Sequence, residues 1–306
     1  METRLYINGT GNISKLKDFE ESCAEVFEPD YRELIAAPKL RRMSRIMKMN
    51  SYAALSAIKN TNTEAPEAIN SATGYGCLSD TEKFLQTFLE NKEQFSNPSA
   101  FINSTHNSLA GNLALLLGIK GQNFTFVHEQ NSFENALIDA ALGFEEGSFQ
   151  NIMVGGADEK TSLVDTISEG LSCKPKGEGA AYLYISKVKT DSSFAVIRSI
   201  NLDFKNTNLN DFVFSILEEN KLIHNDFDFL INGTSLKLPD FSNQIMASGF
   251  TGDYPTVAAL LVVWACEILK SQSIKFPVVE NGTYQRILVI NKYPRGAKSA
   301  IIVEKA

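Results

Sequence analysis

The chain has 306 residues, 43% of them hydrophobic, and its 29 Lys and Arg against 36 Asp and Glu give a net charge of −7. This composition supports a large folded core and excludes a disordered chain. The acidic balance argues against a nucleic-acid-binding protein, which needs a basic face. The apolar run Val257–Cys266 is too short to cross a bilayer and the first residues lack a signal-peptide pattern, so we expect a cytoplasmic protein with no membrane span.

Cysteine and histidine spacing gives no sign of a metal site or of a disulfide framework. There is no CxxC pair and no HExxH motif. We therefore expect reduced thiols, no metal and no cofactor, and we expect His128 to be buried and hydrogen-bonded. The cysteines are Cys23, Cys77, Cys173 and Cys266.

Short runs of apolar residues predict β-strands along the whole chain. Most of these runs are continuously apolar, which is typical of strands buried on both faces. In chain order they are Arg4–Ile7, Asn123–Val127, Asn151–Val154, Tyr182–Ile185, Ala195–Ile197, Phe227–Ile231, Ile287–Ile290 and Ile301–Val303.

Helical periodicity separates these strands. Apolar residues from Phe133 to Phe144 recur along one helical stripe, with Ser132 as the expected N-cap. Gly118 is placed to close a helix over Ser108–Leu117. The other predicted helices are Tyr52–Ile58, Asp80–Leu89 and Thr256–Leu269, the last of which is apolar on nearly all sides and is therefore expected at the centre of the fold.

The order strand, polar turn, helix, strand occurs twice. The first copy runs through Asn123–Val127 to Asn151–Val154, and the second runs through Phe227–Ile231 to Ile287–Ile290. This pattern predicts a duplicated α/β fold with helices between two sheets. We place the division at residue 190, which gives an N-terminal half of 1–190 and a C-terminal half of 191–306.

Seven segments resemble, in the correct order, the motif-bearing segments of the β-ketoacyl synthases. The most specific are "NPSAFINSTHNSLAGNLALLLGIKG", "NFTFVHEQNSFENALIDAALGFEEG" and "NIMVGGADE". The segments "KGEGAAYLYISK", "FLINGTS", "ASGFTGDYPTVAALLVVWACEIL" and "ILVINKYPRGAKSAIIVEK" follow. The resemblance implies the thiolase fold: two similar α/β halves packed as five α/β/α/β/α layers, with the active site between them.

The residues at the catalytic positions differ from those of an active ketosynthase. That enzyme needs a thiolate to carry the acyl chain and two histidines to stabilise the enolate. A carboxamide is no nucleophile at neutral pH, and an ionised carboxylate would repel an enolate. By motif, Gln130 replaces the cysteine, Asn232 and Asp253 replace the histidines, Ser248 replaces the lysine and Arg295 replaces the gating phenylalanine.

The V-x-E-Q turn resembles the chain-length factors of type II polyketide synthases, and the compact length resembles the subunits of aryl polyene and flexirubin systems. That resemblance implies a catalytically inactive subunit that pairs with an active ketosynthase, shapes the acyl tunnel and meets acyl carrier protein mainly through its partner. It places the strand Asn123–Val127 at the two-fold axis of the dimer. The residues of this dimer strand are Asn123, Phe124, Thr125, Phe126 and Val127.

Two further sets of candidates follow from the resemblance. Phe84, Phe88 and Phe133 are candidates for closing the tunnel, and the alternative for the first two is an ordinary core position. Five basic residues within ten positions are candidates for carrier docking, and the alternative is a solvated helix face. They are Lys39, Arg41, Arg42, Arg45 and Lys48.

Other interpretations remain open. Gln130 alone could do no more than satisfy amides near a helix start. The chain could be a thiolase-fold acyltransferase, a hydrolase or a decarboxylase, although it offers no nucleophile–base pair and lacks the histidines that decarboxylation needs. It could also be a homodimeric acyl-binding scaffold.

Overall fold

The computed structural model describes residues 4–23, 25–59, 61, 65–94, 98–163, 166, 177–205, 207–278 and 280–306. Ten strands form one large sheet. Those of the first half are β1 (Leu5–Ile13), β4 (Ala68–Ala72), β5 (Asn123–Phe126), β6 (Asn151–Asp158) and β7 (Gly179–Ser186). Those of the second half are β8 (Ala195–Asp203), β9 (Phe229–Asn232), β10 (Gln244–Met246), β13 (Arg286–Lys292) and β14 (Lys298–Lys305).

The two halves of the sheet have the same strand order. Outward from the centre, the first half runs β1, β7, β6, β4, β5, and the second runs β8, β14, β13, β9, β10. In each half the two outer pairs are parallel and the two inner pairs are antiparallel. The antiparallel pairing of β1 with β8 joins the halves. The structure therefore confirms the duplication; residue 190 lies in the link between β7 and β8, and the exact division there stays a prediction.

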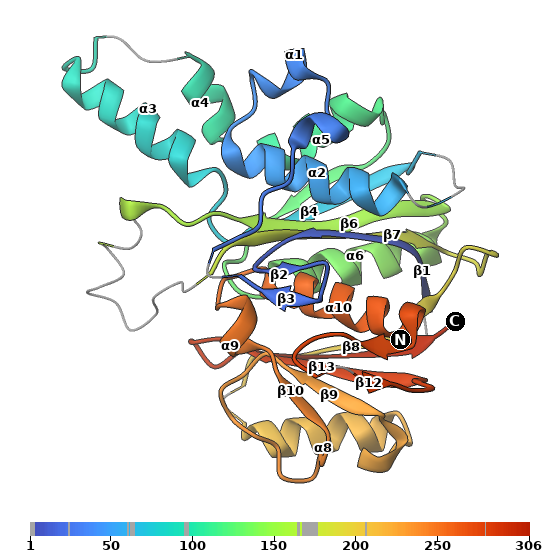
Figure 1. The fold of residues 1–306 in the computed structure, drawn as a ribbon. Helices are drawn as coiled ribbons and strands as arrows, with labels where there is room; N and C mark the ends of the chain where they lie inside the picture. Colours follow the sequence, from blue (N-terminus) through green and yellow to red (C-terminus); the bar gives the residue numbers. More distant parts are fainter. Residues whose placement is uncertain are drawn as a thin grey trace.

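Helices separate and cover the two halves in five layers (Figure 1). α2 (Arg45–Lys59) and α5 (Ser108–Leu117) cover the outer face of the first half, α6 (Ser132–Glu146) and α10 (Val257–Ser271) lie between the halves, and α8 (Leu209–Glu219) covers the outer face of the second half. The predicted five-layer thiolase-like fold is confirmed. No helix in the described ranges is long and apolar enough to cross a membrane.

The largest part of the core lies in the central layer, as the sequence predicts. α10 is buried on nearly all sides, and Trp264 and Leu260 lie fully inside the same apolar cluster as Phe133 and Phe144 of α6. Gly118 closes α5 with a φ of 73°, where a side chain would be strained. The all-round apolar sequence of α10 fits a helix that is buried on nearly all sides, whereas α6 in the same layer keeps an exposed face.

The helices α3 (Leu78–Glu90) and α4 (Pro98–Ser104) form an arm that projects away from the body of the first half (Figure 1). A small hairpin, β2 (Leu16–Lys17) and β3 (Glu21–Ser22), instead folds back onto α10. The remaining short elements are η1 (Tyr31–Glu33), α1 (Ala37–Leu40), η2 (His224–Asp226), α9 (Ser248–Thr251), β11 (Ser273–Ile274) and β12 (Glu280–Asn281).

Candidate functional site

Position 130 lies on a strained turn between β5 and α6. Glu129 and Asn131, on either side of Gln130, have positive φ values of 53° and 68°. Such backbone costs about 1–3 kcal/mol per residue, although six other non-glycine residues of the described chain also adopt it. The Ser132 hydroxyl accepts from the His128 amide at 2.9 Å and donates to the Glu129 carbonyl at 3.3 Å, which stabilises the turn.

Ser132 is not the N-cap of α6, contrary to the sequence prediction. Asn131 occupies that position in the left-handed region, which asparagine tolerates better than most residues, and its side chain makes no capping hydrogen bond. The serine is the first helical residue, and its hydroxyl points back into the turn. The helix therefore begins one residue earlier than the sequence predicts, and the turn is one residue shorter.

Beneath this turn, a buried contact joins the two halves of the chain. The Tyr293 hydroxyl donates to the Glu134 carboxyl at 2.7 Å, and both residues are fully or almost fully buried. Burial raises the pKa of Glu134, although hydrogen bonds from Ser299 and Tyr293 oppose the shift. Burial and the neighbouring Glu134 raise the pKa of Tyr293 well above its usual range. The Tyr293–Glu134 hydrogen bond is therefore a buried donor–acceptor contact between the two halves of the chain.

Asn232, at the first histidine position, has its carboxamide committed to a local loop. It is fully buried at the end of β9. Its Nδ2 donates to the Leu236 carbonyl at 2.8 Å and to Gln244 at 3.3 Å, while its Oδ1 accepts from the Thr234 amide at 2.9 Å. Because both ends of the amide are used, it has no free donor for an enolate.

The other two motif positions are equally unsuited to condensation chemistry. Ser248, at the lysine position, carries no charge, and its hydroxyl donates to the Thr234 carbonyl at 3.4 Å. Asp253, at the second histidine position, is exposed on the turn that follows α9. A carboxylate there offers no hydrogen bond to a developing oxyanion.

Arg295, at the position of the gating phenylalanine, forms an ion pair beside Gln130. Its Nη1 lies 3.1 Å from Glu129 Oε2, and both side chains are exposed. The pair lies on the wall of an open hollow of about 600 Å³ that Gly74, Tyr75 and His106 also line.

Of the three described thiols, Cys23 is half-buried just after β3, and the other two do not replace the missing nucleophile. Cys77 and Cys266 are fully buried, and burial raises the pKa of each thiol well above its usual range. The thiolate is the reactive form, so both are inert structural residues. Cys173 lies outside the described residues. Among those described, no cluster of three or more His, Cys, Asp or Glu side chains is arranged to hold a metal ion.

Sequence analysis did not single out Asp158 and Glu159, two buried carboxylates at the end of β6. Asp158 accepts from the Gly74 amide at 2.8 Å and from the Thr256 amide and hydroxyl at 2.9 and 2.8 Å, so it ties the loop after β4 to the start of α10. Burial raises its pKa to about 6, against these hydrogen bonds. Glu159 accepts from the Ser79 amide and hydroxyl and so caps α3. The sequence does contain a signal that could have identified them, which is a pair of acidic residues at the end of an apolar strand.

Comparisons with known proteins agree with this architecture. The family model described as "Beta-ketoacyl synthase, N-terminal domain" matches residues 20–164. The fold is the thiolase-like fold of the ketosynthases. A comparison with curated protein sequences returns no match.

Three solved structures illustrate the likeness. "The ishigamide ketosynthase/chain length factor" has a TM-score of 0.76 at 15% identity, and covers 99% of this chain and 99% of its own. A type II polyketide synthase acyl carrier protein in complex with its ketosynthase (AntDE:AntF) has a TM-score of 0.78 at 14% identity, with 99% and 100% covered. A β-ketoacyl synthase from Burkholderia phymatum STM815 has a TM-score of 0.71 at 16% identity, with 99% and 100% covered. At these identities the likeness shows the fold alone.

In this ketosynthase fold, the candidate dimer strand β5 lies at one end of the ten-stranded sheet. In the described part of the chain it pairs only with β4, and Phe124 on it is 50% exposed. Asn123 Oδ1 and Thr125 Oγ1 are buried and have no hydrogen-bond partner among the described residues. Val127 follows the strand and is also exposed. A sheet edge of this kind can accept another strand.

The structure places the tunnel candidates in two different environments. Phe84 and Phe88 are half-buried on α3, and their stacked rings have centroids 5.9 Å apart. The centroid of the Phe84 ring also lies 5.2 Å from that of Phe101 on α4. Neither belongs to an apolar cluster of the body. Phe133 is fully buried in the central cluster, so it exposes no surface to a tunnel in this chain as it stands.

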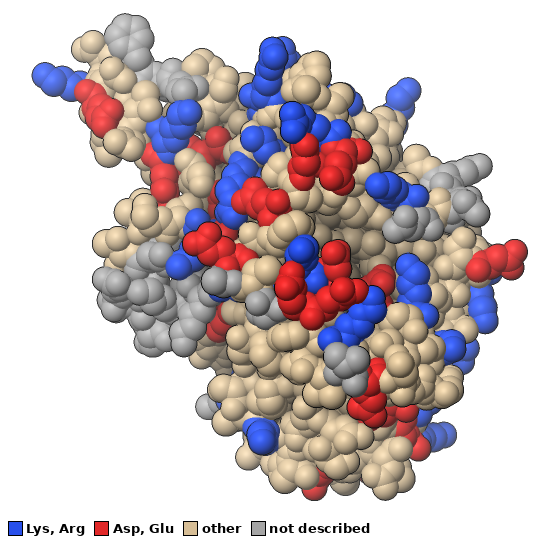
Figure 2. Space-filling view, viewed as in Figure 1, with Lys and Arg blue, Asp and Glu red and all other residues tan. Residues whose placement is uncertain are grey.

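The basic run is divided by its contacts. Lys39, Arg41 and Arg42 are exposed around α1, where Lys and Arg gather at the top of Figure 2, and Lys48 is half-buried. Arg45 binds Glu178 through two nitrogens at 2.6 and 2.8 Å and also binds Glu28 at 2.5 Å. Its guanidinium is committed to internal ion pairs, which leaves the exposed cations as the better docking candidates.

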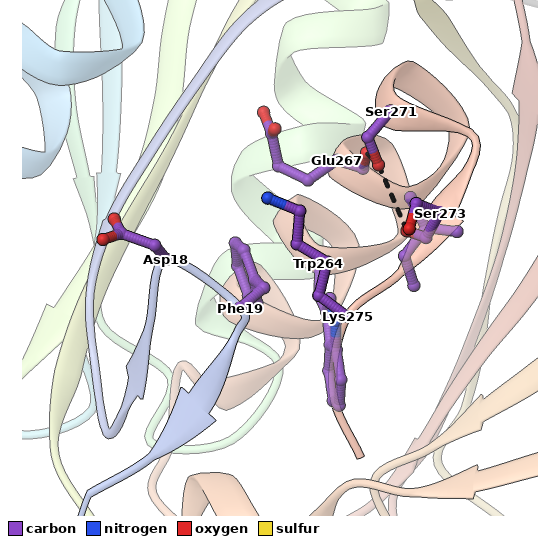
Figure 3. A pocket seen from close by; sticks show the side chains of 8 residues that line it. Asp18, Phe19, Trp264, Glu267, Ser271, Ser273 and Lys275 are labelled. Carbon is purple, nitrogen blue, oxygen red and sulfur yellow. Dashed lines mark hydrogen bonds between the residues drawn. The ribbon is translucent and has the colours of Figure 1, made fainter. Parts of the chain in front are cut away.

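Two other features concern His128 and the β2–β3 hairpin. His128 is exposed, contrary to expectation, because the end of β5 faces outward at the sheet edge. A small hollow of about 70 Å³ lies where the β2–β3 hairpin meets α10 (Figure 3). There the ring of Phe19 stacks on that of Trp264, with 5.9 Å between the ring centroids, and this contact anchors the hairpin. Among the described residues, none that lines this hollow also lines the one beside Arg295.

Proposed function

We propose that this chain is a non-catalytic, chain-length-factor-like subunit that pairs with an active ketosynthase in a type II polyketide pathway in the cytoplasm. The observation that carries this proposal is Gln130 on the strained turn between β5 and α6. The turn keeps the strand–turn–helix geometry that presents a nucleophile, but it presents a carboxamide. A carboxamide cannot form an acyl thioester.

The surroundings of Gln130 support an inactive site. Decarboxylative condensation needs donors aimed at the enolate oxygen, and loss of one such donor costs about 2.7–4 kcal/mol in the transition state. The Asn232 amide is spent on its own loop, and Asp253 is an exposed carboxylate. A loading-type decarboxylase, which keeps its histidines, is therefore disfavoured.

The exposed edge of β5 supports a role as a partner. We propose that the active ketosynthase adds its equivalent strand to Asn123–Phe126, which would cover Phe124 and place the unpartnered oxygens Asn123 Oδ1 and Thr125 Oγ1 in the interface. The solved structure described as a ketosynthase/chain length factor is a precedent for such a pair in this fold.

The proposed interface also has consequences for the product and for the carrier protein. We propose that a growing polyene, of the aryl polyene or flexirubin kind, fills a tunnel between the subunits and that Phe84 and Phe88 limit its length. Acyl carrier protein would dock mainly on the partner, with Lys39, Arg41 and Arg42 as secondary contacts. A type II acyl carrier protein bound to its ketosynthase is a precedent in a relative of the same fold.

Co-expression with a ketosynthase encoded beside this chain tests the proposal. We expect the two chains to co-elute on size exclusion as a one-to-one heterodimer, and we expect this chain alone not to turn over malonyl-carrier protein. Turnover above that of a heat-killed control would contradict inactivity. A stable homodimer that ignores every offered ketosynthase would support the scaffold alternative instead.

A further inference from the structure

We propose that, in the free chain, the edge of β5 pairs with a second copy of this chain, and that ion pairs between Asp139 of one copy and His128 of the other make this self-pairing tighter in mild acid. The free chain would then be a pH-dependent homodimer that a ketosynthase must displace. Only the displacement rests on the proposed function, because the self-pairing follows from the residues of the edge.

The hydrogen bonds between β4 and β5 determine which backbone groups of β5 face the free edge. The carbonyls of Gln122 and Phe126 accept from amides in and just after β4, at 2.9 and 3.1 Å. Since successive residues of a strand alternate, Asn123, Thr125 and Val127 turn their backbone groups outward. An antiparallel pair of these edges centred on Thr125 bonds all three, because Thr125 faces its own copy and Asn123 faces Val127.

In this register the side chains of the edge meet suitable partners on both faces of the sheet. Phe124 falls opposite Phe126 of the copy, at a non-hydrogen-bonded position where cross-strand side chains are closest. This contact would cover Phe124, which is 50% exposed. On the other face, Thr125 Oγ1 is buried without a partner among the described residues, and it would meet the same hydroxyl of the copy. One hydroxyl can donate to the other, so the pair satisfies both.

The two ends of the edge carry groups of complementary charge. Asp139 on α6 accepts from Gln122 at 2.9 Å, which places its carboxylate at the start of β5. His128 lies just beyond the other end, and its ring centroid is 6.5 Å from that of Phe126, which packs against the central cluster to which α6 contributes. Asp139 and His128 therefore share one face, and both line an open hollow of about 650 Å³ along the edge. The antiparallel pair sets Gln122 opposite His128 of the copy, so each carboxylate meets an imidazole.

The pH dependence follows from the charge of the imidazole. Histidine ordinarily gains a proton as pH falls through about 6.5, whereas aspartate stays ionised to about pH 4. Because the carboxylate favours the protonated imidazole, self-pairing takes up protons and tightens as pH falls from 7.5 to 5.5. The other groups around His128 do not replace Asp139: Glu129 is paired with Arg295 at 3.1 Å, Tyr75 is uncharged in this range, and His106 directly precedes α5 on the opposite face.

Cross-linking of the isolated chain tests the register. The Cα atoms of a hydrogen-bonded antiparallel pair lie about 5.5 Å apart, which is within disulfide range. We expect Thr125→Cys to form a disulfide-linked homodimer under mild oxidation, because residue 125 faces itself. Asn123→Cys and Val127→Cys should each fail to cross-link, whereas the double variant should link residue 123 to residue 127 of the copy. Peptide mapping identifies the bond, and circular dichroism confirms that each variant is folded. A folded Thr125→Cys variant without this disulfide would overturn the register.

Sedimentation equilibrium at pH 5.5 and pH 7.5 tests the ion pairs. We expect the homodimer of the unsubstituted chain to be about tenfold tighter at pH 5.5, as two exposed pairs allow. His128→Gln and Asp139→Asn should each remove this difference, and the asparagine keeps an acceptor for Gln122. His106→Gln, in the same hollow, and Glu145→Gln, exposed on α6, should retain it.

Equal dissociation constants of the unsubstituted chain at the two pH values would overturn the proposal, and so would a difference that survives His128→Gln. Because these measurements contain no ketosynthase, they are independent of whether the chain binds one. Failure of the proposed function, which is the absence of a complex with any ketosynthase, is therefore distinguishable from failure of the self-pairing.

Discussion

The surroundings of Gln130 and the arm formed by α3 and α4 are both close to the end of β5, yet they are built in opposite ways. Around the turn, several buried polar groups are paired, as in the Tyr293–Glu134 hydrogen bond and the fully bonded Asn232, although Asn131 Oδ1 has no partner among the described residues. On the arm, large apolar side chains face solvent: Leu89 is 68% and Ile102 is 64% exposed. The turn therefore carries a buried contact between the two halves of the chain. The arm carries exposed apolar side chains, which is the pattern expected of a contact surface.

The largest expected effect separates the edge of β5 from other exposed aromatics. Phe124→Lys should abolish co-elution with the ketosynthase partner, because it places a charge in a strand-to-strand contact. Phe204, which is 69% exposed at the end of β8, offers a matched control, and Phe204→Lys should leave the complex intact. Size exclusion of the co-expressed pairs gives the answer.

Thr125→Pro is a second way to disrupt the same edge, since proline removes an amide donor from the strand. We expect the partner to be lost here too. Circular dichroism must first show that the variant is folded. A folded variant that still co-elutes would place the interface elsewhere.

The next prediction contrasts an arm phenylalanine with a core phenylalanine. Phe88→Ala should lengthen the product of the co-expressed complex by roughly a few carbons at little cost in stability, since Phe88 belongs to no core cluster of the body. Phe144→Ala should lower stability by about 3–5 kcal/mol without a specific change in length, because Phe144 is fully buried. Mass spectrometry of the product and thermal melting check both arms. An unchanged product from a much less stable Phe88→Ala complex would make Phe88 a structural residue.

A smaller difference, in the free energy of unfolding of the isolated chain, distinguishes the buried Tyr293–Glu134 contact from the α3–α4 arm. Tyr293→Phe should lower the free energy of unfolding by about 1–3 kcal/mol, because it leaves the buried Glu134 carboxyl without its donor. Leu89→Ala, at an exposed position, should change it by less than about 0.5 kcal/mol. Urea unfolding of both variants measures the difference, and equal values would mean that the Tyr293–Glu134 contact does not contribute to stability.

Much of the fold could be predicted from the sequence, and the omissions have physical reasons. The apolar runs located most strands, and the all-round apolar pattern located α10. β4 was missed because its sequence "AINSA" is half polar; its Asn70 amide is buried and bonded to Ala136 and Asp139 of α6. β10 has only three residues. α8 was also missed, although its sequence has a helical pattern: Leu209, Phe212, Val213 and Ile216 fall on one helical stripe.

The candidate site could be predicted only as a set of aligned positions. Motif order was enough to single out Gln130 and Asn232. It could not show that the Asn232 amide is used up within its own loop, or that Tyr293 and Glu134 meet, because 159 residues separate that pair in the chain. Arg295 was expected as a degenerate gate residue, but its ion pair with Glu129 needs the two halves in place.

The smallest expected effect is a change in how stability depends on pH. Burial raises the pKa of Glu134, so the folded chain holds that proton to higher pH than the unfolded chain does. Stability contributed by the neutral form is present at low pH and is lost as pH rises from the ordinary glutamate pKa through the raised folded value. Glu134→Gln keeps an acceptor for Tyr293 but cannot ionise, so its stability relative to the unsubstituted chain should increase from pH 5 to pH 8. Glu145→Gln, at an exposed position on the same helix, should show no such trend. Urea unfolding at the two pH values measures both, and a Glu134→Gln difference that stays flat with pH would mean that Glu134 is ionised in the folded chain throughout this range and that the Tyr293–Glu134 contact is not a neutral pair.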